Sequence, residues 1–280
     1  MKFTKMHGCG NDYIYVNGFT EKVDGDKKPE VARRLSHRQH GIGGDGLIFI
    51  NPSQTADFEM EMYNADGTRA QMCGNGIRCV GKYVYDKGMT DKTHIAVESG
   101  GQIKYLDLMT EADIMYVRVN MGSPILTPSR IPVIAEGKRV VNSPMTAGNT
   151  EYYMTCVSMG NPHAVIFTKG VREIELDRIG PVFEYHERFP ERVNTEFVEI
   201  LDKEHCFLRV WERGAGETLA CGTGACAAVV AAVLNHLTEN RVWVTMPGGD
   251  LLIEWDREND VVYMTGPAVT VFEGQVCIDG

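Results

Sequence analysis

Alternating apolar and polar positions predict β-strands along most of the chain. The segment 7–16, HGCGNDYIYV, passes from a polar Gly-Asn loop into a run of aromatic and β-branched residues, as does 157–167, VSMGNPHAVIF. Such runs are typical of strands. The segments 45–50, DGLIFI, and 193–200, VNTEFVEI, have the same character. The pattern predicts a mixed α/β protein rich in strands.

Helical spacing of apolar residues appears in fewer places. A first helix is expected from Pro29 to just before Gly41, with Val31 and Leu35 on one face. A segment from 225 to 237, ACAAVVAAVLNHL, is apolar almost all round, which predicts a helix buried at the centre of its domain.

A further helix is expected directly after Cys73. Ile77, Val80, Val84 and Tyr85 follow helical spacing, and Gly88 is the expected end of the helix.

A cysteine motif occurs twice. MCGNGIRC (Met72–Cys79) and LACGTGAC (Leu219–Cys226) each place a cysteine before Gly-x-Gly at the start of a predicted helix, 148 positions apart. Two further matches lie near this offset: Asn11 is 62 residues before Cys73 and Asn161 is 60 before Cys221, and DGLIFI aligns with VNTEFVEI. An internal duplication is therefore predicted, with a boundary near the turn-rich segment 120–130.

Bulk composition narrows the class of protein. With 280 residues, one core usually divides into two. A net charge of −10 and a pI near 5.3 argue against nucleic acid or an anionic membrane as the main partner. The first ten residues have no apolar leader, and the longest apolar run has 10 residues, so a cytoplasmic protein is expected. Its eight cysteines are then expected to be thiols.

Cys73 and Cys221 are the candidate catalytic residues. A cysteine at a helix start is often only a small core residue, but the glycines that follow each one let a ligand approach the backbone. A helix N-terminus favours a thiolate, and its N–H groups bind carboxylates.

A matched pair of thiols suits inversion of a stereocentre that carries a hydrogen. One thiolate removes the proton from one face and one thiol delivers a proton to the other, and the roles exchange in the reverse direction. Helix N-termini aimed at the substrate carboxylate would stabilise the developing carbanion without a cofactor.

Other thiol chemistries fit less well. Zinc sites and thioredoxin-like sites use Cys-x-x-Cys spacing, which these motifs lack, and no metal is expected. A thiol protease needs one cysteine with a dedicated histidine. GIGGDG (Gly41–Gly46) matches G-x-G-x-x-G but precedes a strand, so a dinucleotide site is rejected.

Five segments resemble the diaminopimelate epimerase family in order along the whole chain: MHGCGND, YNADGTRAQMCGNGIRC, MGNPHAV, RVNTEFV and WERGAGETLACGTGA. The resemblance implies an enzyme independent of pyridoxal phosphate and of any other cofactor, which interconverts LL- and meso-2,6-diaminopimelate for lysine and peptidoglycan synthesis. It also implies two lobes, each a barrel-like sheet around a central helix, with the active site in the cleft between them.

The same resemblance implies roles for individual residues. Cys73 and Cys221 match the base and acid, and His163 matches a supporting group near the thiols. The residues expected to bind substrate are Asn11, Asn64, Gly74, Asn75, Asn161, Asn194, Glu212, Arg213, Gly222 and Thr223. Taken alone, Asn64 and Asn194 fit turn-formers better than substrate-binding residues, and Arg213 fits a surface charge equally well.

Two positions depart from the expected pattern. Many family members carry glutamine where this chain has Gly46, so one contact is absent or replaced. Cys9 lies beside Asn11 but has no cysteine counterpart in the second copy, which argues against a catalytic role.

The lobes are expected to span 1–121 plus 268–280, because the last strand returns to the first lobe in this family, and 122–267. A homodimer with a small-molecule substrate is also implied. Two alternatives remain open: a proline or hydroxyproline racemase, whose first motif usually has histidine where this chain has Asn75, and a protein of the same fold that has lost the two-thiol chemistry.

Overall fold

The computed structural model describes residues 1–70, 72–111 and 114–278. Strands predominate, and the described residues contain four α-helices, so the predicted mixed α/β class is confirmed. Within these residues, none of the helices combines the length and apolarity needed to cross a bilayer.

The chain divides into two compact units, one formed by Met1–Val119 with Gly266–Gly280 and the other by Asn120–Thr265. In the first unit, the strands pair in the order β18–β1–β2–β3–β4–β6–β7–β8, and β5 also pairs with β4. The pairs β2–β3 and β4–β6 are parallel. The bounds of these strands are β1 (Lys2–Gly8), β2 (Asn11–Asn17), β3 (Gly46–Asn51), β4 (Phe58–Asn64), β5 (Arg69–Ala70), β6 (His94–Ser99), β7 (Gln102–Glu111), β8 (Ile114–Gly122) and β18 (Val269–Gln275).

The second unit repeats this pairing scheme. Its order is β9–β10–β11–β12–β13–β15–β16–β17, with β14 also on β13, and the parallel pairs are β11–β12 and β13–β15. The bounds are β9 (Ser143–Ala147), β10 (Thr150–Ser158), β11 (Pro162–Phe167), β12 (Asn194–Ile200), β13 (His205–Glu212), β14 (Gly216–Thr218), β15 (Arg241–Met246), β16 (Gly249–Asp256) and β17 (Val261–Pro267).

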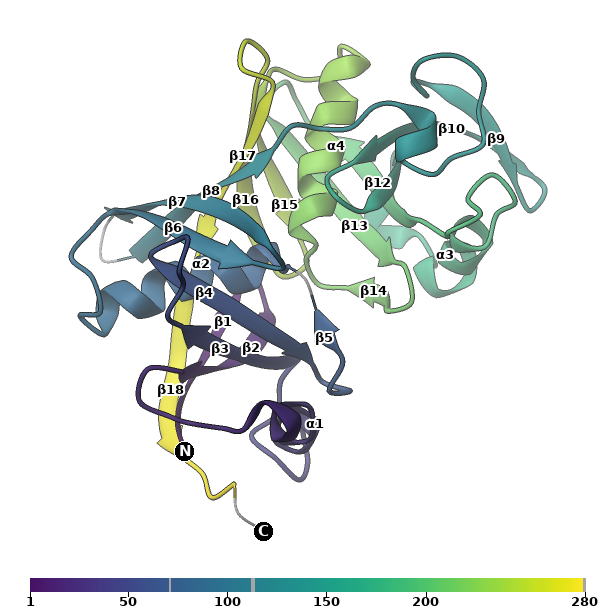
Figure 1. Ribbon diagram of the computed structural model, residues 1–280. Helices are drawn as coiled ribbons and strands as arrows, with labels where there is room; N and C mark the ends of the chain where they lie inside the picture. Colours follow the sequence, from purple (N-terminus) through teal and green to yellow (C-terminus); the bar gives the residue numbers. More distant parts are fainter. Residues whose placement is uncertain (71, 112–113, 279–280) are drawn as a thin grey trace. The chain divides into compact units, whose positions relative to one another are not determined.

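Each unit has one helix packed on two adjacent antiparallel strands and one central helix. In the first unit, α1 packs on β3 and β4, and α2 packs on β1, β2 and β7. In the second, α3 packs on β12 and β13, and α4 contacts β10, β11, β12, β15 and β16 (Figure 1). The helices are α1 (Lys28–Ser36), α2 (Gly74–Asp86), α3 (Leu176–Glu184) and α4 (Gly222–Leu234), with short 3₁₀ turns at Gly25–Lys27, Pro128–Arg130 and Val171–Glu173.

The helices predicted after each cysteine are present. In α4, residues 224–233 are buried without interruption, as the apolar sequence predicted. In α2, Ile77, Val80 and Val84 are buried, whereas Tyr85 is 38% exposed because it lies about 100° around the helix from Val84. The helix ends at Asp86, just before Gly88.

The first helix ends earlier than predicted. It stops at Ser36 rather than near Gly41, because the carbonyl oxygen of Leu35 accepts hydrogen bonds from the N–H groups of Ile42 and Gly43 in the returning loop. Gly41 is needed there for a different reason: a Cβ atom on it would lie 2.4 Å from the carbonyl oxygen of Arg34.

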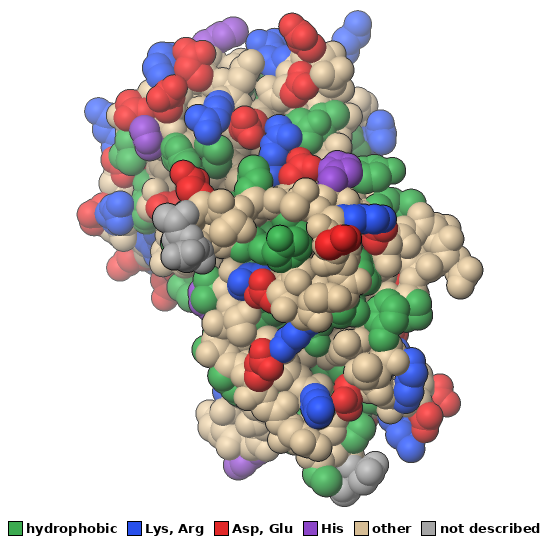
Figure 2. All heavy atoms as spheres, turned by 90° about the vertical axis from the view of Figure 1, so that its left-hand side faces the viewer, with side chains coloured by type: hydrophobic (Ala, Val, Ile, Leu, Met, Phe, Trp, Pro, Cys, Tyr) green, Lys and Arg blue, Asp and Glu red, His purple; other side chains and the backbone are tan. Residues whose placement is uncertain are grey.

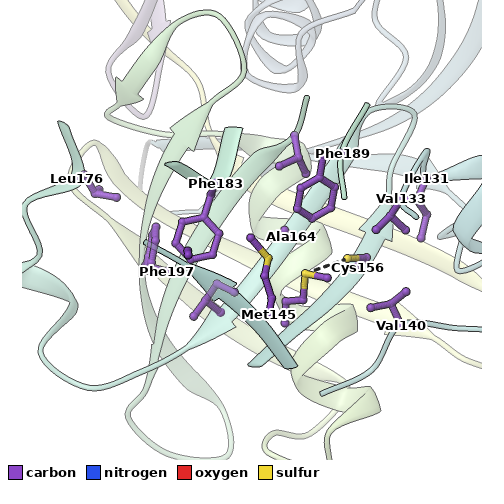
Figure 3. Close-up of a cluster of buried hydrophobic side chains, with 14 of the residues drawn as sticks. Ile131, Val133, Val140, Met145, Cys156, Ala164, Leu176, Phe183, Phe189 and Phe197 are labelled. Carbon is purple, nitrogen blue, oxygen red and sulfur yellow. Dashed lines mark hydrogen bonds between the residues drawn. The ribbon is translucent and has the colours of Figure 1, made fainter. Parts of the chain in front are cut away.

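A cluster of apolar side chains fills the space between α3 and the sheet in the second unit (Figure 3). The Phe183 ring packs edge-on against Phe197, with ring centroids 5.4 Å apart. Tyr152 packs against the other side of Phe183 at 5.1 Å. The strand-rich sheet and α3 therefore share one aromatic core.

Strand β2 has two different faces, since successive side chains of a strand point to opposite sides. Ile14 and Val16 belong to the same apolar cluster as Val31 and Leu35 of α1. Asn11, Tyr13 and Tyr15 alternate with them and lie on the opposite face, toward α2.

On the face of the molecule shown in Figure 2, acidic and basic side chains are interspersed. Charged side chains of the two signs therefore alternate on this face.

Candidate active site

Cys73 is the N-cap residue of α2. Its backbone is extended (φ −134°, ψ 119°), and its carbonyl oxygen accepts the first helical hydrogen bond, from the N–H of Ile77. Its Sγ accepts a hydrogen bond from the N–H of Gly76 (3.3 Å) and, as a thiol, donates one to Oδ1 of Asn11 (3.1 Å). The sulfur therefore has a partner for each of its protonation states.

Cys221 is the N-cap residue of α4, in the same extended conformation (φ −122°, ψ 110°). Its Sγ lies 3.4 Å from Oε2 of Glu212 and 3.5 Å from Oγ1 of Thr223. A thiol donates well to a carboxylate, so this setting favours the protonated form of Cys221.

The second glycine of each motif is required by close packing. A Cβ atom on Gly76 would lie 3.0 Å from Cδ1 of Ile48, and one on Gly224 would lie 2.7 Å from Oε1 of Glu196. The first turn of a helix has N–H groups without intrahelical acceptors, and these groups attract anions. Gly74 and Asn75 begin α2 as Gly222 and Thr223 begin α4, so both helix starts are suited to a carboxylate.

The surroundings raise the pKa values of the two thiols by different amounts. Burial raises the pKa of Cys73, and hydrogen bonds from the backbone N–H groups of Gly76 and Asn75 and from Tyr13 act in the opposite direction. Burial raises the pKa of Cys221 well above its usual range, and the carboxylates of Glu212 and Glu196 raise it further. The first unit thus holds the more easily ionised thiol.

An ionic network fixes Asn11. Its Nδ2 donates to Oδ2 of Asp45 (2.6 Å), and Asp45 also accepts from the N–H of Asp12 (3.1 Å). Arg38 bridges the carboxylates of Asp12 and Asp45, at 2.8 Å from each. With its amide nitrogen held by Asp45, Asn11 must turn its carbonyl oxygen toward Cys73.

A different chain of polar side chains supports the start of α4. Nδ1 of His163 lies 2.7 Å from Oε1 of Glu196, and both side chains are fully buried. Nε2 of His163 lies 2.9 Å from Oδ1 of Asn161, whose Nδ2 donates to Oγ1 of Thr223 (3.2 Å). Thr223 in turn contacts Cys221, so His163 acts on the thiol region through Asn161, as a supporting residue would.

Asn194, Glu212 and Arg213 lie together at the ends of β12 and β13. Oδ1 of Asn194 accepts from the N–H of Arg213 (2.8 Å), and its Nδ2 donates to the carbonyl oxygen of Pro162 (3.0 Å). The exposed Arg213 guanidinium donates to the carbonyl oxygen of Glu191 (2.9 Å). Both polar atoms of Asn194 thus bond backbone groups, so its contribution to substrate binding stays a prediction.

Asn64 and Asn75 are placed differently from each other. Asn64 closes a turn after β4, where its Nδ2 donates to Oγ1 of Thr68 (3.0 Å). The Asn75 side chain is buried, and its Oδ1 accepts from Nη2 of Arg78 (2.9 Å). Asn75 would therefore meet a ligand through its backbone, whereas the role of Asn64 stays a prediction.

The structure adds residues that the sequence alone left unassigned. Asp45 orients Asn11, Glu196 orients His163, Thr218 donates to Oε1 of Glu212, and Arg78 holds Asn75 from a fully buried position. Arg78 falls inside the repeated motif, and a buried arginine next to a candidate thiol was the available signal. Asp45 and Glu196 act through pairings between distant segments, which the sequence does not reveal, and Thr218 reaches Glu212 through the pairing of β13 with β14.

No side chain fits at position 46. A Cβ atom on Gly46 would lie 2.1 Å from the carbonyl oxygen of Tyr63 and 2.9 Å from Cε1 of Tyr13. The contact expected from a glutamine at this position therefore cannot come from residue 46.

The family profile described as diaminopimelate epimerase matches residues 3–127 and 155–271. The chain belongs to the diaminopimelate epimerase family. Its sequence is 58% identical to the diaminopimelate epimerase of Agathobacter rectalis (99% of this chain, all of that one) and 55% identical to that of Acetivibrio thermocellus (99% and 98%). It is also 52% identical to the enzyme of Methanococcus maripaludis strain C5 (99% and 100%).

Solved structures with little sequence similarity share the fold of this diaminopimelate epimerase family member. A PhzF-family phenazine biosynthesis protein from Bacillus anthracis superposes with a TM-score of 0.72 at 15% identity, covering 99% of both chains. A probable proline racemase from Agrobacterium radiobacter superposes with a TM-score of 0.71 at 13% identity, covering 99% of this chain and 93% of that one. These likenesses establish the fold only.

Proposed function

We propose that the protein is a diaminopimelate epimerase that interconverts LL- and meso-2,6-diaminopimelate. The observation that carries this proposal is the cysteine found twice at the N-cap of a central helix, in a chain of this family. Each thiol has its own set of hydrogen-bond partners, which is the arrangement that a two-base reaction requires.

In the proposed reaction, one thiolate removes the Cα proton of the substrate, breaking the Cα–H bond and forming an S–H bond. The second thiol protonates the opposite face of the carbanion and becomes a thiolate. The reverse direction exchanges the two roles. The N–H groups at the starts of α2 and α4 would stabilise the negative charge that develops next to the substrate carboxylate, as prearranged dipoles do.

We also infer that the two units arose by duplication and form two lobes, each a barrel-like sheet around α2 or α4. The shared pairing order and the matching positions of the parallel strand pairs support this inference. The proposed lobes span 1–121 plus 268–280 and 122–267, and the substrate would bind in the cleft between them.

Residues outside the two helix starts are assigned to substrate binding as part of the same proposal. Arg213 presents an exposed guanidinium, which suits the distant carboxylate of diaminopimelate. Asn64 lies at the end of β4, opposite Gly46 in the strand register, and so belongs to the same end of the sheet as Tyr13.

A homodimer is proposed as well. Strand β18 exposes apolar side chains, of which Val271 is 54% and Phe272 is 46% exposed, in addition to Val269. Neighbouring exposed apolar residues are typical of association surfaces. Sedimentation analysis of the wild-type protein and of Val271→Lys tests this: a dimer is expected only for the wild type, and a monomeric wild type would contradict it.

The decisive experiment is mass spectrometry of LL-diaminopimelate incubated with the reduced protein in D₂O, with L-proline and trans-4-hydroxy-L-proline in parallel. Deuterium at one Cα of diaminopimelate, with appearance of the meso form, is expected. Exchange confined to the proline compounds would reassign the protein to racemisation of cyclic amino acids. Exchange in none of the three would refute the two-thiol reaction.

A further inference from the structure

Strand β2 presents three polar side chains to the start of α2. Asn11 accepts from Sγ of Cys73 (3.1 Å), and two alternations further along, the hydroxyl of Tyr15 donates to the carbonyl oxygen of Gly76 (3.2 Å). Tyr13 lies between them on the same face. Asn11 and Tyr15, which flank Tyr13 on this face of the strand, are thus both bonded to the start of α2. This places the Tyr13 ring alongside Cys73.

Gly46 provides the space for this ring. Tyr13 pairs with Gly46 in the parallel β2–β3 register, and a Cβ atom on residue 46 would lie 2.9 Å from Cε1 of Tyr13. Tyr13 is only 5% exposed. The ring is therefore held between β3 and α2, and the hydroxyl of a tyrosine buried in this way usually has a hydrogen-bond partner in the protein.

We propose that the hydroxyl of Tyr13 donates a hydrogen bond to Sγ of Cys73 when that sulfur is a thiolate, and so positions the base of the reaction. The carbonyl oxygen of Asn11 then serves the thiol form, whereas the hydroxyl of Tyr13 and the N–H of Gly76 serve the thiolate. Proton transfer at Cys73 exchanges one set of partners for the other without movement of the helix. The catalytic consequence rests on the proposed function, but the hydrogen bond itself does not.

Electrostatics at this position agree with the geometry. The hydrogen bond from Tyr13 lowers the pKa of Cys73, opposing the effect of burial. Burial raises the pKa of Tyr13 well above its usual range, and Cys73 and Asp45 raise it further, so Tyr13 stays protonated and remains a donor. Arg78 also stabilises the Cys73 thiolate, whereas Cys79, with a pKa raised to about 11 by burial, is a neutral neighbour.

The second unit uses its equivalent position differently. Aligning Gly10-Asn11 with Gly160-Asn161 places His163 at the position of Tyr13. The two residues hold the same place in their parallel strand pairs: His163 lies opposite Asn194, and Tyr13 lies opposite Gly46. His163 bonds Asn161 and Glu196, whereas Cys221 contacts Glu212 and Thr223. The phenol is therefore specific to the environment of Cys73.

The test is the pH dependence of alkylation of Cys73 by iodoacetamide in Tyr13→Phe, followed by peptide mass spectrometry without substrate. Removing one donor to a thiolate is expected to raise the apparent pKa of Cys73 by about one unit, which is about tenfold slower alkylation near neutral pH. Cys221 in the same sample serves as the internal reference. Tyr63→Phe is the matched control, because its hydroxyl donates to Glu61 rather than to a thiol.

A second variant strengthens the donor instead of removing it. Replacing Tyr13 by 3,5-difluorotyrosine lowers the pKa of the phenol, and is expected to lower the apparent pKa of Cys73. If the pH profile of Cys73 alkylation in Tyr13→Phe is the same as in the wild type, the proposal is overturned. If the phenylalanine variant does not fold, an unchanged profile in the fluorinated protein overturns it. Deuterium exchange into diaminopimelate is measured separately, so failure of the epimerase proposal and failure of the Tyr13 proposal are distinguishable.

Discussion

At the scale of single residues, the two thiols have neighbours of opposite character. Cys73 is surrounded by hydrogen-bond donors and by the buried Arg78, whereas the carboxylates of Glu212 and Glu196 act on Cys221. An anionic neighbour opposes ionisation of a thiol. The two halves of the proposed reaction are therefore not electrostatically equivalent, although the backbone around each cysteine is the same.

Removal of the Glu212 charge should make Cys221 easier to ionise. In Glu212→Gln, the apparent pKa of Cys221 is expected to fall, because the negative charge that raises it is lost while the side-chain volume is kept. The pH dependence of Cys221 alkylation measures this. Glu217→Gln is the control, since Glu217 pairs with Arg209; an unchanged Cys221 profile in Glu212→Gln would contradict the assignment.

Each of the two thiols proposed as base and acid should be needed for turnover. Cys73→Ser and Cys221→Ser are each expected to reduce epimerisation of diaminopimelate by about 100- to 10,000-fold, because a serine hydroxyl is too weakly acidic to replace a thiol in proton transfer. Circular dichroism should show an unchanged fold. The exposed Cys277 provides the matched substitution, Cys277→Ser, which should leave turnover unaltered.

At the scale of elements, α1 is tied to the sheet by a partly buried ion pair. Lys28, the first residue of α1, pairs with Glu61 in the middle of β4. Burial alone would raise the pKa of Glu61, but hydrogen bonds from Lys28, Tyr63 and Asn51 outweigh it and hold the pKa below its usual range. This contribution to stability is present above the unfolded-state pKa and is lost as pH falls through the lower folded-state value.

Glu61→Gln should therefore lower the free energy of unfolding by about 1–3 kcal/mol near pH 7, since it leaves Lys28 without its charged partner. The difference from wild type should shrink as pH falls through the lowered pKa of Glu61, where the wild-type carboxylate becomes protonated. Urea unfolding at several pH values measures it, with Glu111→Gln, on an exposed position of β7, as reference. A difference that stays the same from pH 7 down to the acid unfolding of the protein would argue against the ion pair.

Glycine at position 46 should be essential to the β2–β3–β4 arrangement. In Gly46→Ala, the new Cβ atom would lie 2.1 Å from the carbonyl oxygen of Tyr63, so a strand must shift. A loss of about 1–3 kcal/mol in the free energy of unfolding is expected. Gly88→Asn, at a left-handed position with open space around it, is a mild control, and equal effects of both changes would contradict the packing argument.

The sequence predicted the elements whose signals are local. The apolar run of α4, the cysteine N-caps and the repeated motif all depend on neighbouring residues. The end of α1 could not be predicted from the sequence, because the hydrogen bonds to Leu35 come from a loop that folds back on the helix. The setting of Tyr13 was also missed, because it depends on β3 lying beside β2 with glycine at the facing position.

At the scale of the whole chain, the last strand belongs with the first. Strand β18 pairs antiparallel with β1 from Lys2 to His7 (Figure 1). Without it, β1 would have an unpaired edge and Phe3 would lose its edge-on partner Phe272.

Deletion of residues 268–280 should therefore loosen the first unit selectively. Hydrogen-exchange mass spectrometry is expected to show loss of protection in peptides from β1 and β2, with protection retained in α4, which packs on strands of the second unit. Deletion of residues 276–280 only, beyond the end of β18, is the control. Full protection of β1 in the longer deletion would show that β18 is dispensable.

The pairing of β18 with β1 also fixes an order of events during protein synthesis. Strand β1 is translated before the second unit, but its partner β18 is translated after that unit. The second unit, continuous from Asn120 to Thr265, can complete its hydrogen bonds earlier. The unit whose translation begins first thus completes its sheet last, and β1 must remain unaggregated while the second unit is made.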